Sequence, residues 1–338
     1  MRVLITGGSG LIGGHLVRRL LAAGDTPVVV SRRADALRRD PATREYEVVQ
    51  GDPTTTGHWQ EAVDGCDAVV NLVGHNVFAE RWNAGVKRKI RDSRVYGTEH
   101  VVAAIAAAKV RPRVLVQGSA IGYYGPCEDQ ELDEGAPSGS DFLAVVCREW
   151  EDASAPVDGL GVRRAVVRIG VVLAPGDGAL KIMTPLFKIG PGVPVGGNGG
   201  LAPARGRQWM SWIHIEDIVG ILDLALRNPE ARGPINGVAP NPVRNADFSR
   251  ALSRALWKPY APWRIFLPFG PPDILLRLTL GEVADVIAKG QRVVPRKALQ
   301  LGYDFRHPEL TKALASLFQN PPDASSQRPE AARKEAGR

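Results

Sequence analysis

The sequence predicts an α/β fold with a parallel sheet covered by helices on both faces, because short apolar runs alternate with amphipathic helical stretches. A glycine-rich turn joins the first apolar run directly to the first helical stretch. The chain has 338 residues, of which 44% are hydrophobic and 23% charged. That length suits one large domain with a lobe, or two domains.

Six apolar runs are predicted to form the strands of this sheet, and a seventh is the candidate last strand. Runs that are apolar throughout are typical of parallel strands buried on both faces. In chain order they are 3–5, 28–30, 48–49, 68–73, 114–117 and 165–169, with 235–238 as the seventh. Helices are predicted at 11–20, 84–108, 141–155, 180–189 and 215–227, and again over most of the chain from 245.

The pattern changes after residue 172, where a Gly- and Pro-rich stretch begins. We therefore predict a sheet domain at 1–172, to which 214–238 returns. The segments 173–213 and 239–318 form a smaller, discontinuous C-terminal substrate lobe. The last segment, 319–338, has almost no large apolar residue, so we expect a disordered tail.

The formal net charge of +7 is spread over many short basic pairs. A nucleic-acid-binding protein more often has a basic stripe interleaved with aromatic residues, so no nucleic-acid partner is expected. A basic cleft for an anionic cofactor or substrate explains part of the charge.

The three cysteines, Cys66, Cys127 and Cys147, have no CxxC spacing and leave an odd number. This pattern predicts neither a disulfide framework nor a metal site, and it favours a reducing, cytoplasmic setting. The first predicted strand begins at Arg2, so no signal peptide is expected. No apolar run reaches the roughly 20 residues of a membrane span, so no membrane partner is expected.

Gly7, Gly10 and Gly13 are spaced three apart between a predicted strand and a predicted helix. Gly7 permits a tight turn, Gly10 permits close approach of a pyrophosphate, and Gly13 permits close packing of helix on strand. The helix N-terminus then offers N–H donors to phosphate. The sequence thus predicts a Rossmann-type, doubly wound, dinucleotide-binding sheet.

The end of the second strand distinguishes the two nicotinamide dinucleotides. NAD sites place a carboxylate there, whereas this strand ends in Ser31-Arg32-Arg33. Guanidinium groups suit a 2′-phosphate, so NADP is the predicted cofactor. The alternative is that these arginines are solvated loop charges. Asp52 is a candidate adenine contact, and the alternative is a turn residue.

Several segments resemble one family. They are Asn71-Leu72-Val73-Gly74, Arg81-Trp82, Arg91-Asp92-Ser93-Arg94, the run from Ser119 to Gly125, the run from Phe142 to Glu151, Arg168-Ile169-Gly170-Val171-Val172-Leu173, the run from Gln208 to His214, Asn236-Gly237-Val238-Ala239-Pro240 and Gly290-Gln291-Arg292-Val293-Val294-Pro295. Over roughly residues 1–315 the chain resembles the YfcH-type "epimerase family" branch of the atypical extended short-chain dehydrogenases/reductases. That branch is NAD-dependent epimerase/dehydratase-like, its C-terminal segment has no assigned role, and a plastid and cyanobacterial relative is linked to division.

The resemblance implies a set of cofactor contacts. In the order of the chain they are Gly7, Gly10, Leu11, Ile12, Gly13, Ser31, Arg32, Leu72, Val73, Gly74, Lys89, Arg94, Ser119 and Val172.

The superfamily's usual Tyr-x-x-x-Lys pair is missing. Aligning the helix 142–151 on its final glutamate places Leu143 at the Tyr position and Cys147 at the Lys position. The serine position falls on Ala120 or on Ser119. The remaining catalytic candidates are Ser119, Tyr123 as an acid and Cys147 as a base or nucleophile. The alternatives are that Tyr123 packs in its turn and that Cys147 is a core residue.

The C-terminal half contributes further candidates, each with a structural alternative. His214 is a candidate acid or base, or a hydrogen-bonded structural residue, and Asp217 is expected to be a first-turn helix charge. Trp209 and Trp212 are candidate pocket walls. Glu282 and Asp285 are candidate substrate-facing residues, and the alternative is that they lie on a solvent-exposed helix face. Gln291 and Arg292 are candidates for binding an anionic substrate.

Two functions are compatible with these residues. The first is an NADP-dependent oxidoreductase or nucleotide-sugar-epimerase-like enzyme of atypical mechanism, acting on an unidentified small molecule. The second is a non-catalytic NADP(H)-binding regulatory protein, either redox-sensing or division-linked. A homodimer is expected by analogy with the superfamily.

Overall fold

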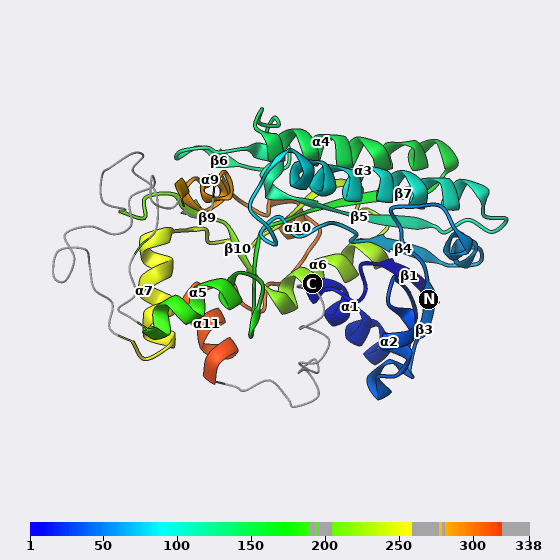
Figure 1. Cartoon of the computed structure of the whole chain (residues 1–338), viewed down its shortest axis with the longest axis horizontal. Helices are drawn as coiled ribbons and strands as arrows, with labels where there is room; N and C mark the ends of the chain where they lie inside the picture. Colours follow the sequence, from blue (N-terminus) through cyan, green and yellow to red (C-terminus); the bar gives the residue numbers. More distant parts are fainter. Residues whose placement is uncertain (190–193, 195–204, 259–276, 279–280, 320–338) are drawn as a thin grey trace.

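A seven-stranded parallel sheet forms the centre of the molecule, with the order β11-β7-β5-β4-β1-β2-β3 (Figure 1). The computed structural model describes residues 1–189, 194, 205–258, 277–278 and 281–319. The strands are β1 (Arg2–Thr6), β2 (Thr26–Ser31), β3 (Glu47–Gln50), β4 (Ala68–Asn71), β5 (Val114–Ala120), β7 (Arg163–Ile169) and β11 (Gly233–Gly237). The predicted fold class is confirmed, and the segment predicted as a seventh strand forms one edge of the sheet.

Helices cover both faces of the sheet. Along β1, Val3 and Ile5 pack into a cluster with α1 and α6, whereas Leu4 packs into a second cluster with α3. Successive residues of a strand point to opposite faces, so both faces of this strand are apolar and buried. The helices beside the sheet are α1 (Leu11–Ala22), α2 (Ala34–Arg38), α3 (Ala84–Ala107), α4 (Phe142–Ser154) and α6 (Ile215–Arg227), with 3₁₀ turns η1 (Pro41–Thr43), η2 (His58–Val63), η3 (Ile121–Tyr124) and η4 (Ala155–Leu160).

A second apolar core lies away from the sheet, where Leu180, Trp212, Phe248 and Leu314 are buried together. Figure 1 shows α5, α7 and α11 grouped on the side of the molecule opposite β3. The elements of this region are α5 (Gly178–Ile189), α7 (Asn245–Ala255), α9 (Val283–Ala288), α10 (Arg296–Gln300) and α11 (Leu310–Gln319), with short strands β6 (Glu131–Leu132), β8 (Val171–Ala174), β9 (Trp209–Met210), β10 (Trp212–His214), β12 (Val243–Arg244) and β13 (Arg292–Val293).

The short strands were not predicted, because two to four residues carry no readable alternation. They pair as β10 with β8, β12 with β9 and β13 with β6. Each pair joins segments that are distant in the sequence, and β13–β6 attaches the C-terminal part of the chain to the segment after β5. The predicted boundaries between sheet domain and lobe remain predictions.

Two predicted boundaries need correction. β4 ends at Asn71 rather than at residue 73. The Asn71 side-chain amide donates to Thr98 Oγ1 and to Gln117 Oε1, each at 2.9 Å, and the chain leaves the sheet after this anchored residue. Gln319 belongs to α11 and not to the tail, and 320–338 lies outside the described residues. Among the described helices, none is long and apolar enough to cross a membrane.

β1 and β4 are adjacent although β2 and β3 separate them in the sequence. The chain therefore leaves these two strands toward opposite edges of the sheet. A crevice outside the carboxyl ends of strands at such a topological switch point is the usual ligand position in open α/β sheets. The glycine loop follows β1, and Leu72 follows β4.

Candidate functional site

The loop between β1 and α1 has no space for side chains at two of its glycines. Gly7 has φ +68°, and a Cβ there would lie 2.6 Å from the carbonyl oxygen of Leu72. A Cβ on Gly13 would lie 2.4 Å from the carbonyl oxygen of Gly7. α1 has Gly10 as its N-cap, without a side-chain cap or an acidic residue in the first turn. The exposed N–H donors and the positive end of the helix dipole therefore fit a phosphate group.

The end of β2 offers positive charge. Ser31 Oγ accepts a hydrogen bond from the Arg33 N–H at 3.1 Å, and the Arg32 side chain is exposed. Within the described residues, no carboxylate forms an ion pair with Arg32. Asp52 Oδ1 instead accepts hydrogen bonds from the N–H and hydroxyl of Thr54, at 2.9 and 2.8 Å. This geometry favours the turn alternative for Asp52, and its adenine contact remains a prediction.

Arg94 reaches from α3 to the end of β4. A Cβ on Gly74 would lie 3.1 Å from Arg94 Cζ, so the guanidinium packs closely on the backbone of Gly74. Arg94 Nη1 donates to the carbonyls of His75 and Ile90, each at 2.9 Å, and Cζ lies 5.0 Å from the Trp150 ring centroid. Burial lowers the pKa of Arg94. A cation without a carboxylate partner among the described residues is suited to a polar or anionic ligand.

Gly178, the first residue of α5, lies between Val172 and the first turn of α1, whereas Lys89 pairs with Glu80. A Cβ on Gly178 would lie 2.9 Å from the Val172 carbonyl oxygen and 3.2 Å from Leu11 Cδ2, which places β8 beside the first turn of α1. The Lys89 side chain is 60% exposed and its Nζ lies 3.5 Å from Glu80. The cofactor contact predicted for Lys89 remains a prediction.

Ser119 belongs to a buried ionic network. Its hydroxyl donates to Glu151 Oε1 at 2.7 Å. Arg168 donates to both oxygens of Glu151, from Nε and Nη2, at 2.9 Å each. The side chains of Arg168 and Glu151 are only 4% and 11% exposed. The network joins β5, α4 and β7, and it occupies the Ser119 hydroxyl as a donor.

The same network continues into the two tyrosines of η3. Arg168 Nη1 donates to the Tyr124 hydroxyl at 3.0 Å, and that hydroxyl donates to Asn236 Oδ1 at 2.7 Å. Burial raises the pKa of Tyr124 to about 12. Arg168 Cζ lies 3.5 Å from the ring centroid of Tyr123. Tyr124 is therefore structural, and Tyr123 is held by a cation–π contact with its ring half-buried.

At the positions of the superfamily's catalytic Tyr and Lys, this chain has Leu143 and Cys147, and both side chains lie beside η3. Neither side chain is suited to proton transfer. A Cβ on Gly122 would lie 3.4 Å from Leu143 Cβ and 3.7 Å from Cys147 Sγ. Burial raises the pKa of Cys147 to about 12, because the thiolate would lose its hydration. The geometry therefore favours the core alternative for Cys147 over a base or nucleophile.

This burial predicts a thiol-labelling pattern. At pH 8 we expect one thiol of the native chain, Cys127, to react readily with a disulfide reagent, because Cys66 and Cys147 are buried and have raised pKa values. Unfolding should make all three react. Fast native labelling that a Cys147→Ser variant removes would contradict this picture and restore Cys147 as a catalytic candidate.

His214 has a structural position. Its Nδ1 accepts a hydrogen bond from the Glu216 N–H at 3.1 Å, which caps α6, and its ring stacks on His307 with centroids 3.7 Å apart. Burial lowers the pKa of His214 to about 4, so the ring is neutral at physiological pH. The structural alternative is thus favoured.

Asp217 is more than the first-turn charge that was predicted. Its side chain is fully buried and accepts hydrogen bonds from the Tyr303 hydroxyl and from the N–H groups of Arg306 and His307, at 2.9 to 3.0 Å. It therefore attaches the segment before α11 to α6.

The remaining candidates in the lobe are engaged with neighbouring residues. Gln291 Nε2 donates to the Ile121 carbonyl at 2.8 Å, and Arg292 pairs with Glu131 at 3.2 Å while lying 5.0 Å from the Trp209 ring centroid. Trp212 is buried in the second core. Glu282 pairs with Lys87, and Asp285 pairs with Arg277 at 2.7 Å.

Sequence reasoning missed the roles of Arg168 and Glu151. A signal for Arg168 was present, because it is the one charged residue inside the apolar run 165–169. A guanidinium in a strand buried on both faces needs a carboxylate partner. Glu151 had no comparable signal, since α4 carries several acidic residues.

The sheet order, the glycine loop at the switch point and the polar groups after β5 define a dinucleotide-binding fold of the short-chain dehydrogenase/reductase kind. The chain matches the model of the "NAD dependent epimerase/dehydratase family" over residues 3–237 and belongs to that family. Residues 271–317 match a domain of unknown function. The resemblance described from the sequence is confirmed.

Three relatives illustrate the match. The chain is 40% identical over 322 residues to the Arabidopsis thaliana "Epimerase family protein SDR39U1 homolog, chloroplastic", covering 94% of this chain and 87% of the relative. It is 38% identical to "Epimerase family protein Mb2239" of Mycobacterium bovis, covering 94% and 98%. It resembles the crystal structure of human epimerase family protein SDR39U1 (isoform 2) with NADPH at a TM-score of 0.81 and 34% identity, covering 95% and 100%.

Proposed function

We propose that this chain binds NADP(H), with the pyrophosphate on the glycine loop and the 2′-phosphate at Ser31 and Arg32. The observation that carries the proposal is the end of β2, where the guanidinium of Arg32, which has no ion pair with the described residues, stands in place of the carboxylate of an NAD site. The backbone-packed turn at Gly7 and Gly13 supports it. So does the human relative, which was crystallised with NADPH.

Arg32 is expected to determine the preference for the 2′-phosphate. We expect Arg32→Gln to weaken NADPH binding about tenfold or more, since a charge-assisted hydrogen bond contributes roughly 1.5–3 kcal/mol. NADH affinity should stay unchanged. Titration calorimetry with both nucleotides measures this, and Arg39→Gln, another exposed arginine of the same segment, is the matched control. Equal losses for NADPH and NADH in Arg32→Gln would exclude a 2′-phosphate contact.

We further propose an oxidoreductase or epimerase-like activity on a small molecule in a reducing compartment. Bound NADP(H) would accept or donate hydride, while Arg94 and Tyr123 lie beside the expected nicotinamide position and orient polar groups. A screen following NADPH absorbance against carbonyl compounds, sugars and nucleotide sugars tests this. Turnover that Tyr123→Phe reduces at least about tenfold would support Tyr123 as the proton donor. Absence of turnover across the panel would count against an enzyme.

A second function is favoured by the buried Cys147 and by the Ser119 hydroxyl held by Glu151. With these groups unsuited to proton transfer, we propose as the alternative a regulatory protein whose partner contacts, including a homodimer, change with bound NADP(H). Partner capture and sedimentation should then differ between NADPH-bound, NADP-bound and nucleotide-free protein. Identical behaviour in the three states would exclude it.

A further inference from the structure

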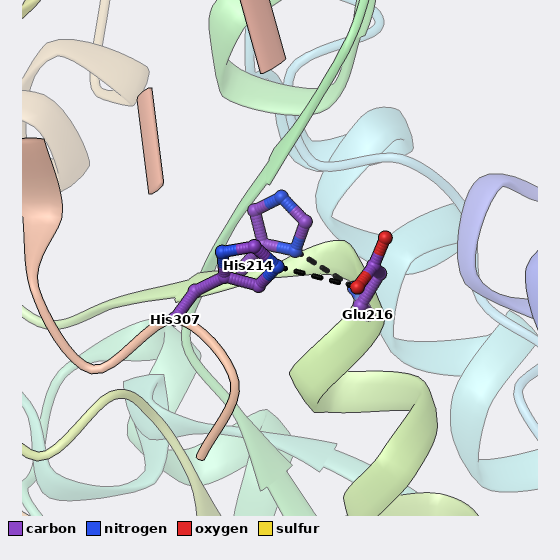
Figure 2. A group of neighbouring side chains, drawn as sticks. All are labelled: His214, Glu216 and His307. Atoms are coloured by element: carbon purple, nitrogen blue, oxygen red, sulfur yellow. Dashed lines mark hydrogen bonds and ion pairs between the residues drawn. The ribbon is translucent and has the colours of Figure 1, made fainter. Parts of the chain in front are cut away.

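Two histidines and a glutamate that are distant in the sequence meet where the segment before α11 contacts the start of α6. His214 is the last residue of β10 and the N-cap of α6, Glu216 lies in the first turn of α6, and His307 follows 91 residues after Glu216. One nitrogen or oxygen atom from each of the three side chains lies within 4.8 Å of the other two. Figure 2 shows a ring nitrogen of each histidine directed toward Glu216.

One pair of candidate ligand atoms has a spacing close to that around a tetrahedral ion. His307 Nε2 lies 3.2 Å from Glu216 Oε2. Bonds of about 2.0–2.2 Å to nitrogen and oxygen place tetrahedral ligands roughly 3.3 Å apart. A shared ion therefore fits between these two atoms without moving them apart. One ring nitrogen of His214 lies within 4.8 Å of both atoms, so a modest rearrangement would bring all three side chains onto one ion.

The surroundings of His214 also suit a ligand. Its other ring nitrogen, Nε2, lies 3.4 Å from Ser316 Oγ on α11. A hydrogen bond from Nε2–H to this hydroxyl leaves the lone pair on Nδ1, the atom that faces the cluster. Ligating histidines commonly have such an outer hydrogen-bond partner, which fixes the tautomer and the orientation of the ring.

Two neighbouring contacts oppose an ion. His214 Nδ1 accepts the Glu216 N–H, and the ion must displace that hydrogen bond. Arg306 Nη1 lies 3.7 Å from Glu216 Oε2, although its side chain is 63% exposed and can turn into solvent. Half-buried His15 on α1 is the other nearby ionisable group that acts on His214. The site is therefore expected to select ions that bind imidazole strongly.

We propose that His214, Glu216 and His307 form a three-ligand binding site for a divalent transition-metal ion of the zinc class, with the fourth position open to water. Imidazole nitrogens prefer zinc and its neighbours, whereas Mg²⁺ and Ca²⁺ prefer oxygen ligands. An ion there attaches the 303–316 segment to α6 in addition to the hydrogen bonds of Asp217. Metal binding is thus expected to stabilise the contact between the lobe and the sheet domain.

The test uses the full chain after dialysis against a chelator, with Zn²⁺ as the probe in titration calorimetry and Co²⁺ as a spectroscopic substitute. We expect one zinc per chain, visible absorption of four-coordinate Co²⁺, no binding of Mg²⁺ or Ca²⁺, and a Tm that rises with zinc. His307→Phe keeps a ring stacked on His214, and Glu216→Gln keeps the size of the side chain. Each should weaken zinc binding at least about tenfold and abolish the rise in Tm.

His58→Ala is the matched control, because His58 is exposed and lies 3.1 Å from Glu61 in a surface pair. It should bind zinc as the natural chain does. Thermal transitions of the metal-free variants establish that each variant folds. Failure of the natural chain to bind zinc would overturn the proposal. So would full zinc affinity in both His307→Phe and Glu216→Gln, or loss of the single site in His58→Ala.

Discussion

Replacing either partner of the Arg168–Glu151 pair is expected to destabilise the protein by about 3–5 kcal/mol, because the remaining charge stays buried without its partner. Glu151→Gln leaves the guanidinium without an anion, and Arg168→Met leaves the carboxylate with only the Ser119 hydroxyl. Urea unfolding monitored by circular dichroism gives the change in unfolding free energy.

The double variant Glu151→Gln/Arg168→Met combines the same two substitutions, so it isolates the energy of the pairing. It removes both charges, so it should be less destabilised than the sum of the single variants, with a coupling energy of about 1–3 kcal/mol. Arg113→Gln, which removes an ion pair with Asp67 in which the arginine side chain is 81% exposed, is the control and should change stability by less than about 1 kcal/mol. Single variants at Arg168 and Glu151 no worse than this control would show that the buried network contributes little.

Gly13→Ala is expected to reduce NADPH affinity at least about 100-fold, which corresponds to roughly 2.8 kcal/mol. The new Cβ would lie 2.4 Å from the Gly7 carbonyl oxygen. The clash is with backbone atoms, which cannot move aside as the end of a flexible side chain can. The loop must therefore shift, and the N–H groups at the start of α1 would no longer be in position to bind phosphate. Fluorescence titration of NADPH measures the loss.

The neighbouring glycine gives a matched control in the same helix. A Cβ on Gly14 would lie 3.8 Å from the Gly8 carbonyl oxygen, an ordinary contact. Gly14→Ala should therefore retain NADPH affinity and gain about 0.5–1 kcal/mol of stability, because alanine loses less backbone entropy than glycine in a helix. If both variants bound NADPH equally well, the backbone-packed turn would not be what the nucleotide requires.

The sheet was predictable because its signals are local. Each strand is a short apolar run, and the glycine spacing at 7, 10 and 13 marks one specific turn between strand and helix. The short strands and the histidine cluster were not predictable, since their partners are distant in the sequence. His307 and Glu216 are 91 residues apart, and no spacing rule connects them.

In the functional site, too, local features could be predicted from the sequence, whereas contacts between distant segments could not. Ser31 and Arg32 were predicted as 2′-phosphate contacts from their place at the end of a strand, and the structure places both at the end of β2. The position of Ser119 also followed from its strand, but its hydrogen bond to Glu151 depends on how α4 packs against β5. The sequence showed that Tyr-x-x-x-Lys was missing, and packing then determined that the thiol at the Lys position is buried and neutral.

The central claim is a nucleotide site selective for NADP(H), and one titration tests it most directly. Purified full-length chain, freed of nucleotide, is titrated with NADPH and with NADH under identical conditions in a calorimeter. We expect one NADPH per chain, bound at least about tenfold tighter than NADH, since the 2′-phosphate adds about 1.4 kcal/mol or more. Absence of NADPH binding, or NADH binding that equals or exceeds it, would contradict the assignment.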